Sequence, residues 1–181
     1  MIYYKIRIVN IFLIISFCSA TPADSSCSFE HPTKSIINLA SVGLRNGQSH
    51  YRDLSSPSGS YYTYSFNPCY PFVESHCYNA AVCQIDNTSN TSYTIGLHEY
   101  AYLVNMNGTK NPISWSVYLS PHNNRHLYVQ LICNRSMSSH CLQVLGEMSI
   151  DEYVMKLSSP YACRDGCVKS TPPPGSFNWH F

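Results

Sequence analysis

The sequence has little charge, and its basic residues form no stripe. Charged residues make up 12% of the 181 positions, with 11 Lys and Arg against 10 Asp and Glu. Nucleic-acid-binding proteins gather Lys and Arg on one face, so the composition argues against such a partner. The sequence also lacks HExxH, GxSxG and any metal-spaced acidic cluster. We therefore expect no enzyme, no metal site and no cofactor.

Long apolar runs are absent except at the N-terminus. Lys5 and Arg7 precede an apolar stretch from Ile8 to Cys18, and small residues end at Ala20. This is the layout of a secretory signal peptide. The stretch is about half of the roughly 20 residues that a membrane span needs. We expect residues 1–20 to be a signal peptide, and the mature chain to be lumenal or extracellular without a transmembrane segment.

Helical periodicity is scarce. Residues 35–47, SIINLASVGLRNG, fit either one short helix or two strands. The rest of the chain shows short runs rich in Tyr, Val, Ile and Thr between turns, which is typical of strands. These runs are SYYTYSF, AAVCQI, SYTIGLHEYAYLVNMNG, ISWSVYL, RHLYVQLIC and EYVMKLSS. We predict an all-β fold over residues 21–168, a flattened β-barrel or sandwich of two packed antiparallel sheets, followed by a Pro- and Gly-rich tail over 169–181.

Cysteines and glycosylation sequons agree with a secretory route. Eight cysteines remain after Cys18, and an even number in a secreted chain indicates four disulfides. Their spacing does not give the pairing, because eight cysteines allow 105 arrangements. A zinc site is not indicated, since the single CxxxC, Cys163 to Cys167, has no second pair. The Asn-x-Ser/Thr sequons stand in turn-like polar segments, at Asn87, Asn90, Asn107 and Asn134.

Three polar residues fall at or next to core-facing positions. In RHLYVQLIC, strand alternation puts Arg125 on the same face as Leu127, Val129, Leu131 and Cys133. A guanidinium in such a row must lie at a rim or be paired.

Tyr153 shares a face with Met155 and Leu157 in the same way, and Gln84 lies within the apolar run AAVCQI. Taken singly, these three residues would be a capped amide, a snorkelling arginine and an ordinary tyrosine at the core edge.

The order of several segments resembles a known lectin family. DLSSPSGSYYTYSFNPC is followed by AAVCQI, YTIG, an Arg before LIC, and EYVMKLSSPYAC. Together they are similar to the lectin domain of the mannose 6-phosphate receptors and their endoplasmic-reticulum relatives, from about Cys27 to Cys163. The resemblance implies a flattened β-barrel that binds mannose-type glycans on glycoproteins, for recognition or sorting in the lumen of the secretory and lysosomal pathway.

The resemblance also implies which side chains hold the sugar. The family uses a Gln, an Arg, a Glu and a Tyr, and the matching residues here are Gln84, Arg125, Glu147 and Tyr153. Glu152 is an alternative for the Glu, although on a regular strand it points away from Tyr153. An amide and a guanidinium suit a mannose, whose hydroxyls both donate and accept, and a carboxylate accepts from them.

Four disulfides are implied by the same resemblance. The expected pairs are Cys27–Cys69, Cys77–Cys83 and Cys133–Cys163, with Cys141–Cys167 left as a bridge particular to this chain. The Cys77–Cys83 bridge would tie the loop that leads into Gln84.

The sequence departs from the family in ways that leave the ligand open. The loop SPHNN before Arg125 has no acidic residue, and only His122, Asn123 and Asn124 could donate to a phosphate. No tandem tryptophan is present either. We expect plain and phosphorylated mannose to bind within about tenfold of each other. The alternative function is a disulfide-rich secreted interaction module with the same barrel and no sugar binding. The sequence indicates neither the oligomeric state nor whether the chain is a receptor without its membrane segment.

Overall fold

The computed structural model describes residues 27–30, 36–57, 59–106, 113–121 and 124–165. The predicted signal peptide and tail, Asn107, His122, Asn123 and Cys167 lie outside these ranges. Within them the chain is almost entirely β-structure, closed by one 3-10 turn, η2 (Pro160–Ala162). The strands are β1 (Ser28–Glu30), β2 (Ile36–Asn38), β3 (Tyr51–Ser55), β4 (Tyr62–Phe66), β5 (Phe72–Glu74), β6 (Cys77–Asp86), β7 (Thr91–Met106), β8 (Ile113–Ser120), β9 (Arg125–Cys133), β10 (Cys141–Ser149) and β11 (Glu152–Ser159).

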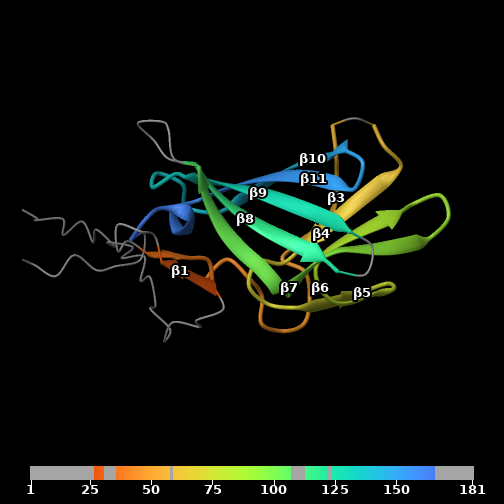
Figure 1. Ribbon diagram of the computed structural model, residues 1–181, viewed down its shortest axis with the longest axis horizontal. Helices are drawn as coiled ribbons and strands as arrows, with labels where there is room; N and C mark the ends of the chain where they lie inside the picture. The colour runs from red at the N-terminus through yellow and green to blue at the C-terminus, as the bar shows by residue number, and fades with distance from the viewer. Residues whose placement is uncertain (1–26, 31–35, 58, 107–112, 122–123, 166–181) are drawn as a thin grey trace, which may run out of the picture.

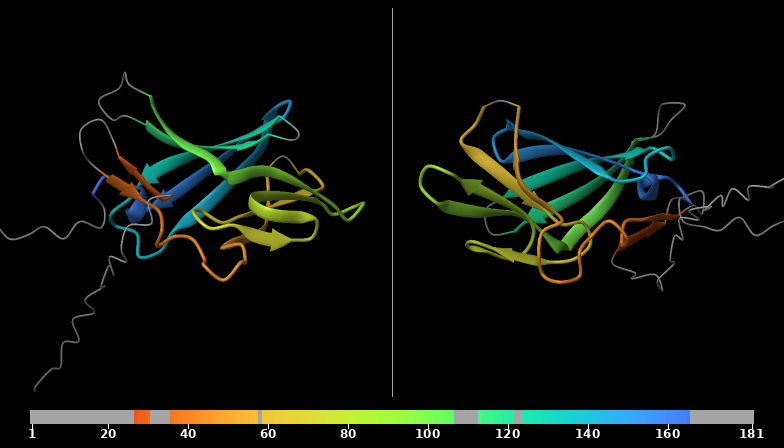
Figure 2. Two further views of the ribbon diagram at one scale, coloured as in Figure 1. Left: turned by 60° about the horizontal axis from the view of Figure 1, so that its bottom comes forward. Right: turned by 180° about the vertical axis from the view of Figure 1, so that it is seen from behind.

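Nine of the strands form one curled sheet (Figures 1 and 2). Its order is β10-β11-β9-β8-β7-β6-β4-β3, with β5 paired to β6, while β1 and β2 pair separately. All pairs are antiparallel except β9 and β11, which run parallel. The predicted fold class, an all-β, barrel-like and disulfide-stabilised domain, is confirmed.

The first and last strands of the curled sheet come close together and nearly close the barrel. The rings of His50 and His140 lie 5.1 Å apart, centroid to centroid. Further along, a Cβ added to Gly146 would lie 3.0 Å from the Cβ of Ser56. Gly146 also has a positive φ of 87°, which a residue with a side chain adopts only with strain. Glycine at this position therefore lets β10 approach the segment that follows β3.

The core faces inward from both walls of the barrel. In β9, Leu127, Val129 and Leu131 are buried, as the alternation predicted. Figure 1 shows β8, β9 and β11 as long neighbouring strands, and Met155 and Leu157 of β11 are buried with this row. Apolar burial of this kind supplies most of the driving force for folding.

Several segments were not predicted from the sequence pattern, β1, β3 and β5 among them. Of residues 35–47, the described part forms only the three-residue strand β2 followed by turns, and no helix. Strand β10 was not predicted at all. Its pairing with β11 shifts register twice, between Val144 and Gly146 and between Glu147 and Ser149. These irregularities break the two-residue period on which strand prediction depends.

Candidate functional site

Gln84 is a buried amide in the middle of β6. Gln84 is 2% exposed, and its cross-strand partners are Tyr64 of β4 and Tyr93 of β7. The Nε2 group donates a hydrogen bond of 3.2 Å to the Tyr64 hydroxyl. The Oε1 atom accepts one of 3.4 Å from Nη1 of Arg125. The amide therefore has partners for both of its ends, as a buried polar group must.

Arg125 begins β9, and its guanidinium is enclosed by side chains from three other strands and a turn. Its side chain is 18% exposed. The guanidinium carbon lies 4.6 Å from the centroid of the Tyr93 ring and 6.0 Å from that of Tyr153. Its Nε atom lies 3.5 Å from Oδ1 of Asp151. The aromatic faces and this carboxylate fix the orientation of the charge.

Tyr153 and Tyr64 line the same interior space. Their ring centroids are 6.2 Å apart, and each residue is 2% exposed. Burial raises the pKa of both phenols, and the nearby Glu147 carboxylate raises the pKa further while Arg125 opposes it. Both hydroxyls therefore stay protonated at neutral pH and can donate as well as accept.

Glu147 lies on β10 opposite Tyr153, with which it is paired in register. Its side chain is exposed, and Oε1 accepts a hydrogen bond of 3.0 Å from the backbone N–H of Asp151. The alternative carboxylate, Glu152, accepts from the Ser149 hydroxyl instead. The exposed Glu152 acts electrostatically on Tyr128 and not on Tyr153.

The four sequence-predicted residues thus form one group of side chains. Gln84 contacts Arg125, the Arg125 charge lies over Tyr153, and Glu147 acts on the Tyr153 phenol. Three further members of the group were not predicted from the sequence: Tyr64, Tyr93 and Asp151. The sequence signal that could have identified Tyr93 is its place in the quoted segment YTIG, and the structure adds that it is paired with Gln84.

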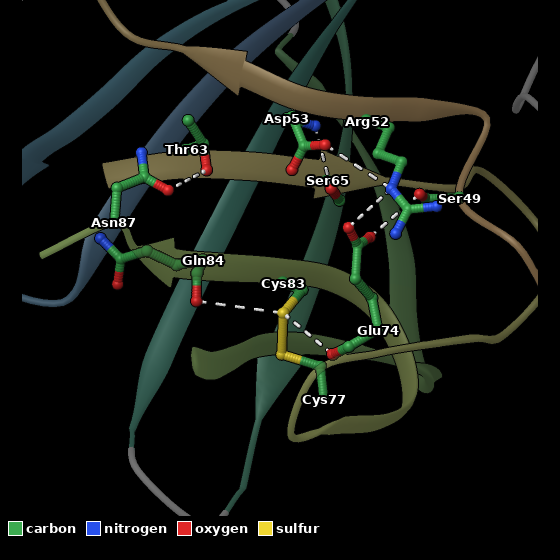
Figure 3. Close-up of polar contacts among 10 residues, drawn as sticks. All are labelled: Ser49, Arg52, Asp53, Thr63, Ser65, Glu74, Cys77, Cys83, Gln84 and Asn87. Carbon is green, nitrogen blue, oxygen red and sulfur yellow. Dashed lines mark hydrogen bonds and ion pairs between the residues drawn. A yellow bond between two sulfur atoms is a disulfide. The ribbon is translucent and has the colours of Figure 1, made fainter. Parts of the chain in front are cut away.

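A disulfide braces β6 beside this group. Cys77 and Cys83 are bonded, as the resemblance implied, and the second of them directly precedes Gln84 (Figure 3). The Cys83 sulfur lies 3.8 Å from the carbonyl oxygen of Glu74 and 3.9 Å from that of Gln84. A disulfide sulfur carries no proton, so these are packing contacts. The bridge ties the start of β6 to the residue before Gln84, and its Cys83 sulfur packs against the end of β5.

The other bridges follow the same expectation. Cys27–Cys69 joins the residue before β1 to the loop after β4, and Cys133–Cys163 joins the end of β9 to the residue after η2. Disulfides of this number are typical of secretory or extracellular domains. Cys141 is exposed and has no disulfide partner among the described residues. Its expected partner, Cys167, lies outside them.

Three of the four sequons fall within the described ranges. Asn87 and Asn90 lie in the exposed turn between β6 and β7, and Asn90 has a positive φ of 53°. Asn134 follows β9 in a turn, where its side chain accepts bonds from the backbone N–H and the hydroxyl of Ser136. These positions match the turn locations predicted for them, while their glycosylation stays a prediction.

Metal and membrane features are both missing from the described part of the chain. The residues in these ranges contain no group of three or more His, Cys, Asp or Glu that could hold a metal ion. Within the same ranges, no helical segment combines the length and apolarity that a bilayer crossing needs.

Comparison with known proteins gives the fold. No protein-family model matches the sequence, and no curated protein matches it either. Among solved structures, domain 11 of chicken IGF2R is similar over 79% of this chain and 95% of that chain, with a TM-score of 0.58 and 15% sequence identity. That domain is a mannose 6-phosphate receptor homology domain. The chain shares the fold of that domain. The resemblance read from the cysteines and strands is therefore confirmed for the fold.

Proposed function

We propose that this protein is a secretory-pathway lectin that binds mannose-type glycans through Gln84, Arg125, Glu147 and Tyr153. The observation that carries the proposal is the contact group itself. The residue types expected from the resemblance come from four separate strands: Gln84 and Tyr153 lie at the Arg125 guanidinium, and Glu147 is paired in register with Tyr153. The similarity in fold to the IGF2R domain supports the proposal only through the similar arrangement of the strands.

The chemistry of the group suits a pyranose. An arginine has five N–H donors, and in the described ranges the polar partners of Arg125 are Gln84 and Asp151, so donors remain for sugar hydroxyls. The Glu147 carboxylate can accept from further hydroxyls. An axial hydroxyl that bonds to both an amide and a guanidinium would separate mannose from its epimer, because the wrong epimer leaves buried polar groups unpaired.

Access to Gln84 and Tyr153 requires a small rearrangement. Both residues are 2% exposed, so Arg125 and Glu147 are the groups that a sugar meets first. The Arg125–Gln84 contact is 3.4 Å, at the long end of hydrogen-bond geometry. A sugar hydroxyl can replace this contact at small cost. We infer that the sugar inserts between the amide and the guanidinium while Tyr93 stays stacked on Arg125.

Substitution of Arg125 tests the proposal. The purified chain is applied to an array of N-glycans, and the Arg125→Lys variant is compared with it. Charge-assisted bonds contribute about 1.5–3 kcal/mol each, so their loss abolishes measurable binding of a single mannose-terminated glycan. Lysine does not rescue it, because an ammonium cannot reproduce the planar fork. Gln84→Ala and Tyr153→Phe weaken binding.

Matched variants serve as controls. Arg135 is exposed and donates to the backbone carbonyl of Arg164, so Arg135→Lys leaves binding unchanged. Glu147→Gln weakens binding, whereas Glu152→Gln does not. If Arg125→Lys binds mannose glycans like the parent chain, the lectin site is wrong and the alternative of a protein-interaction module is favoured.

A further inference from the structure

The Arg125 guanidinium lies beside one carboxylate, and a second carboxylate is bonded to the backbone of the first. Asp151 lies 3.5 Å from its Nε atom, and Glu147 is hydrogen-bonded to the Asp151 backbone. The contacts of this group therefore hold one cation and two carboxylates. The only other basic side chain with a salt bridge among the described residues, Arg52, pairs with Asp53 and Glu74.

Asp151 is held in place by its backbone. It occupies the turn between β10 and β11 with a positive φ of 62°. Its N–H donates to Glu147, and its carbonyl accepts a bond of 2.8 Å from the N–H of His126, the residue after Arg125. The backbone of Asp151 is thus fixed beside Arg125, and its carboxylate, on a side chain that is 39% exposed, lies at the Nε edge of the guanidinium.

With Asp151 in this position, a neutral ligand and a negatively charged ligand meet different conditions at Arg125. A sugar hydroxyl can use the remaining guanidinium donors while Asp151 keeps its contact. A phosphate monoester carries a charge of about −1.5 to −2 at neutral pH, and its recognition by arginine requires paired N–H donors on one edge. It must either displace Asp151 or bind beside two carboxylates of like charge.

We propose that Asp151 is a specificity-determining residue that makes this site take neutral, unphosphorylated glycans and disfavour phosphorylated ones. The inference rests on the proposed function, since it names the ligand class of the same site. It goes further than the loop SPHNN, which predicts only the absence of a strong preference for phosphate.

The test compares two ligands and three proteins. A mannose-terminated oligosaccharide and the same compound with a 6-phosphate are titrated into the parent chain, Asp151→Asn and Asp53→Asn, at about pH 7.5, where the phosphate is mostly dianionic. Asp53 is the matched control because it also has a positive φ, of 53°, and lies 3.6 Å from an arginine Nε. Asparagine tolerates this backbone conformation, so both variants keep the fold.

We expect the parent chain to bind the neutral glycan about tenfold more tightly at low ionic strength, and the difference to shrink near 1 M salt, where charges more than about 3 Å apart are screened. Asp151→Asn brings the ratio close to one by strengthening the binding of the phosphorylated sugar, and Asp53→Asn keeps the parental ratio. The neutral sugar binds Asp53→Asn and the parent chain similarly, and the role of Asp151 is judged from the ratio of the two affinities within the Asp151→Asn variant.

Three results would overturn the inference, and they are distinguishable. A parent chain that binds neither sugar removes the proposed function and the inference with it. A parental ratio in Asp151→Asn leaves the lectin function standing and removes the role of Asp151. A tenfold preference of the parent for the phosphorylated sugar assigns phosphate binding to the loop before Arg125 and contradicts the inference alone.

Discussion

Two arginine–aspartate pairs in this molecule have similar local geometry and different surroundings. Arg52 lies 3.6 Å from Asp53, and Arg125 lies 3.5 Å from Asp151, in each case from the arginine Nε to a carboxylate oxygen. Both aspartates adopt a positive φ. Arg52, however, has a side chain that is 61% exposed, whereas that of Arg125 is 18% exposed.

At Arg52 the buried partner is a carboxylate. Glu74 is 7% exposed, its Oε1 lies 2.9 Å from the Arg52 Nε, and its Oε2 accepts a bond of 3.1 Å from the Ser49 hydroxyl (Figure 3). Both carboxylate oxygens are therefore used within the protein. The cluster joins β3, β5 and the segment before β3, and it contributes to stability.

At Arg125 the guanidinium itself is the shielded group. Its hydrogen-bond partner is the neutral amide of Gln84, and the ring of Tyr93 lies on its face. An exposed arginine bonded to a buried carboxylate has a structural role, whereas a shielded arginine with donors to spare is suited to recognition. Both arginines form an ion pair, and the difference between them is which group of the pair is buried.

The largest expected effect is on the free energy of unfolding, and it tests whether the Arg52 cluster is structural and the Arg125 group is not. Glu74→Ala leaves the buried Ser49 hydroxyl without its acceptor and removes the Arg52 partner, which should cost about 2–3 kcal/mol. Arg125→Ala should cost less, about 1 kcal/mol, because the buried Gln84 Oε1 atom that it leaves without a donor loses only a long contact of 3.4 Å. Urea unfolding of both variants measures this. Equal losses would mean that the Arg125 group is also structural.

Lowering the pH should reduce the stability of the fold by an intermediate amount. His50 and His140 pack against each other where β3 meets β10, and burial lowers the pKa of both, with His140 lowering that of His50 further. Burial lowers the pKa of His98 as well. Because these folded-state values lie below the unfolded value of about 6.5, stability is full above that pH and falls as the pH drops through and below it.

Thermal unfolding between about pH 7.5 and pH 5 measures the acid effect, and we expect Tm to fall by a few degrees, roughly. The His140→Gln variant should show a shallower pH dependence. Arg125→Ala should keep the parental dependence, since His50 and His140 act at the seam between β3 and β10 and His98 packs against Tyr118. A melting temperature that does not change over this range would contradict the prediction.

The smallest expected effect concerns the ring that covers Arg125. Tyr93→Ala removes a cation–π contact worth about 0.5–1 kcal/mol, so glycan affinity should fall about two- to fivefold. Tyr93→Phe keeps the ring and should bind like the parent chain. Calorimetric titration with a mannose-terminated oligosaccharide measures the difference. Tighter binding by Tyr93→Ala would instead make the ring a cover over the site.

Local pattern was sufficient for part of the fold. Strands β9 and β11 have the residue limits predicted from alternation, because each presents one apolar face to the core. Strand β10 was missed, since Gly146 and two register shifts interrupt its alternation. The three disulfides seen among the described residues came from the resemblance and not from spacing, which left the pairing open.

The site divides in the same way. The resemblance indicated Gln84, Arg125, Glu147 and Tyr153, and strand alternation by itself placed only Arg125 and Tyr153 in core-facing rows. Only the tertiary structure decided that the Tyr64 hydroxyl meets the Gln84 amide and that the turn after β10 brings Asp151 to Arg125. Sequence patterns report the period of one strand, whereas these contacts depend on how the sheet curls and how a turn with positive φ aims its carboxylate.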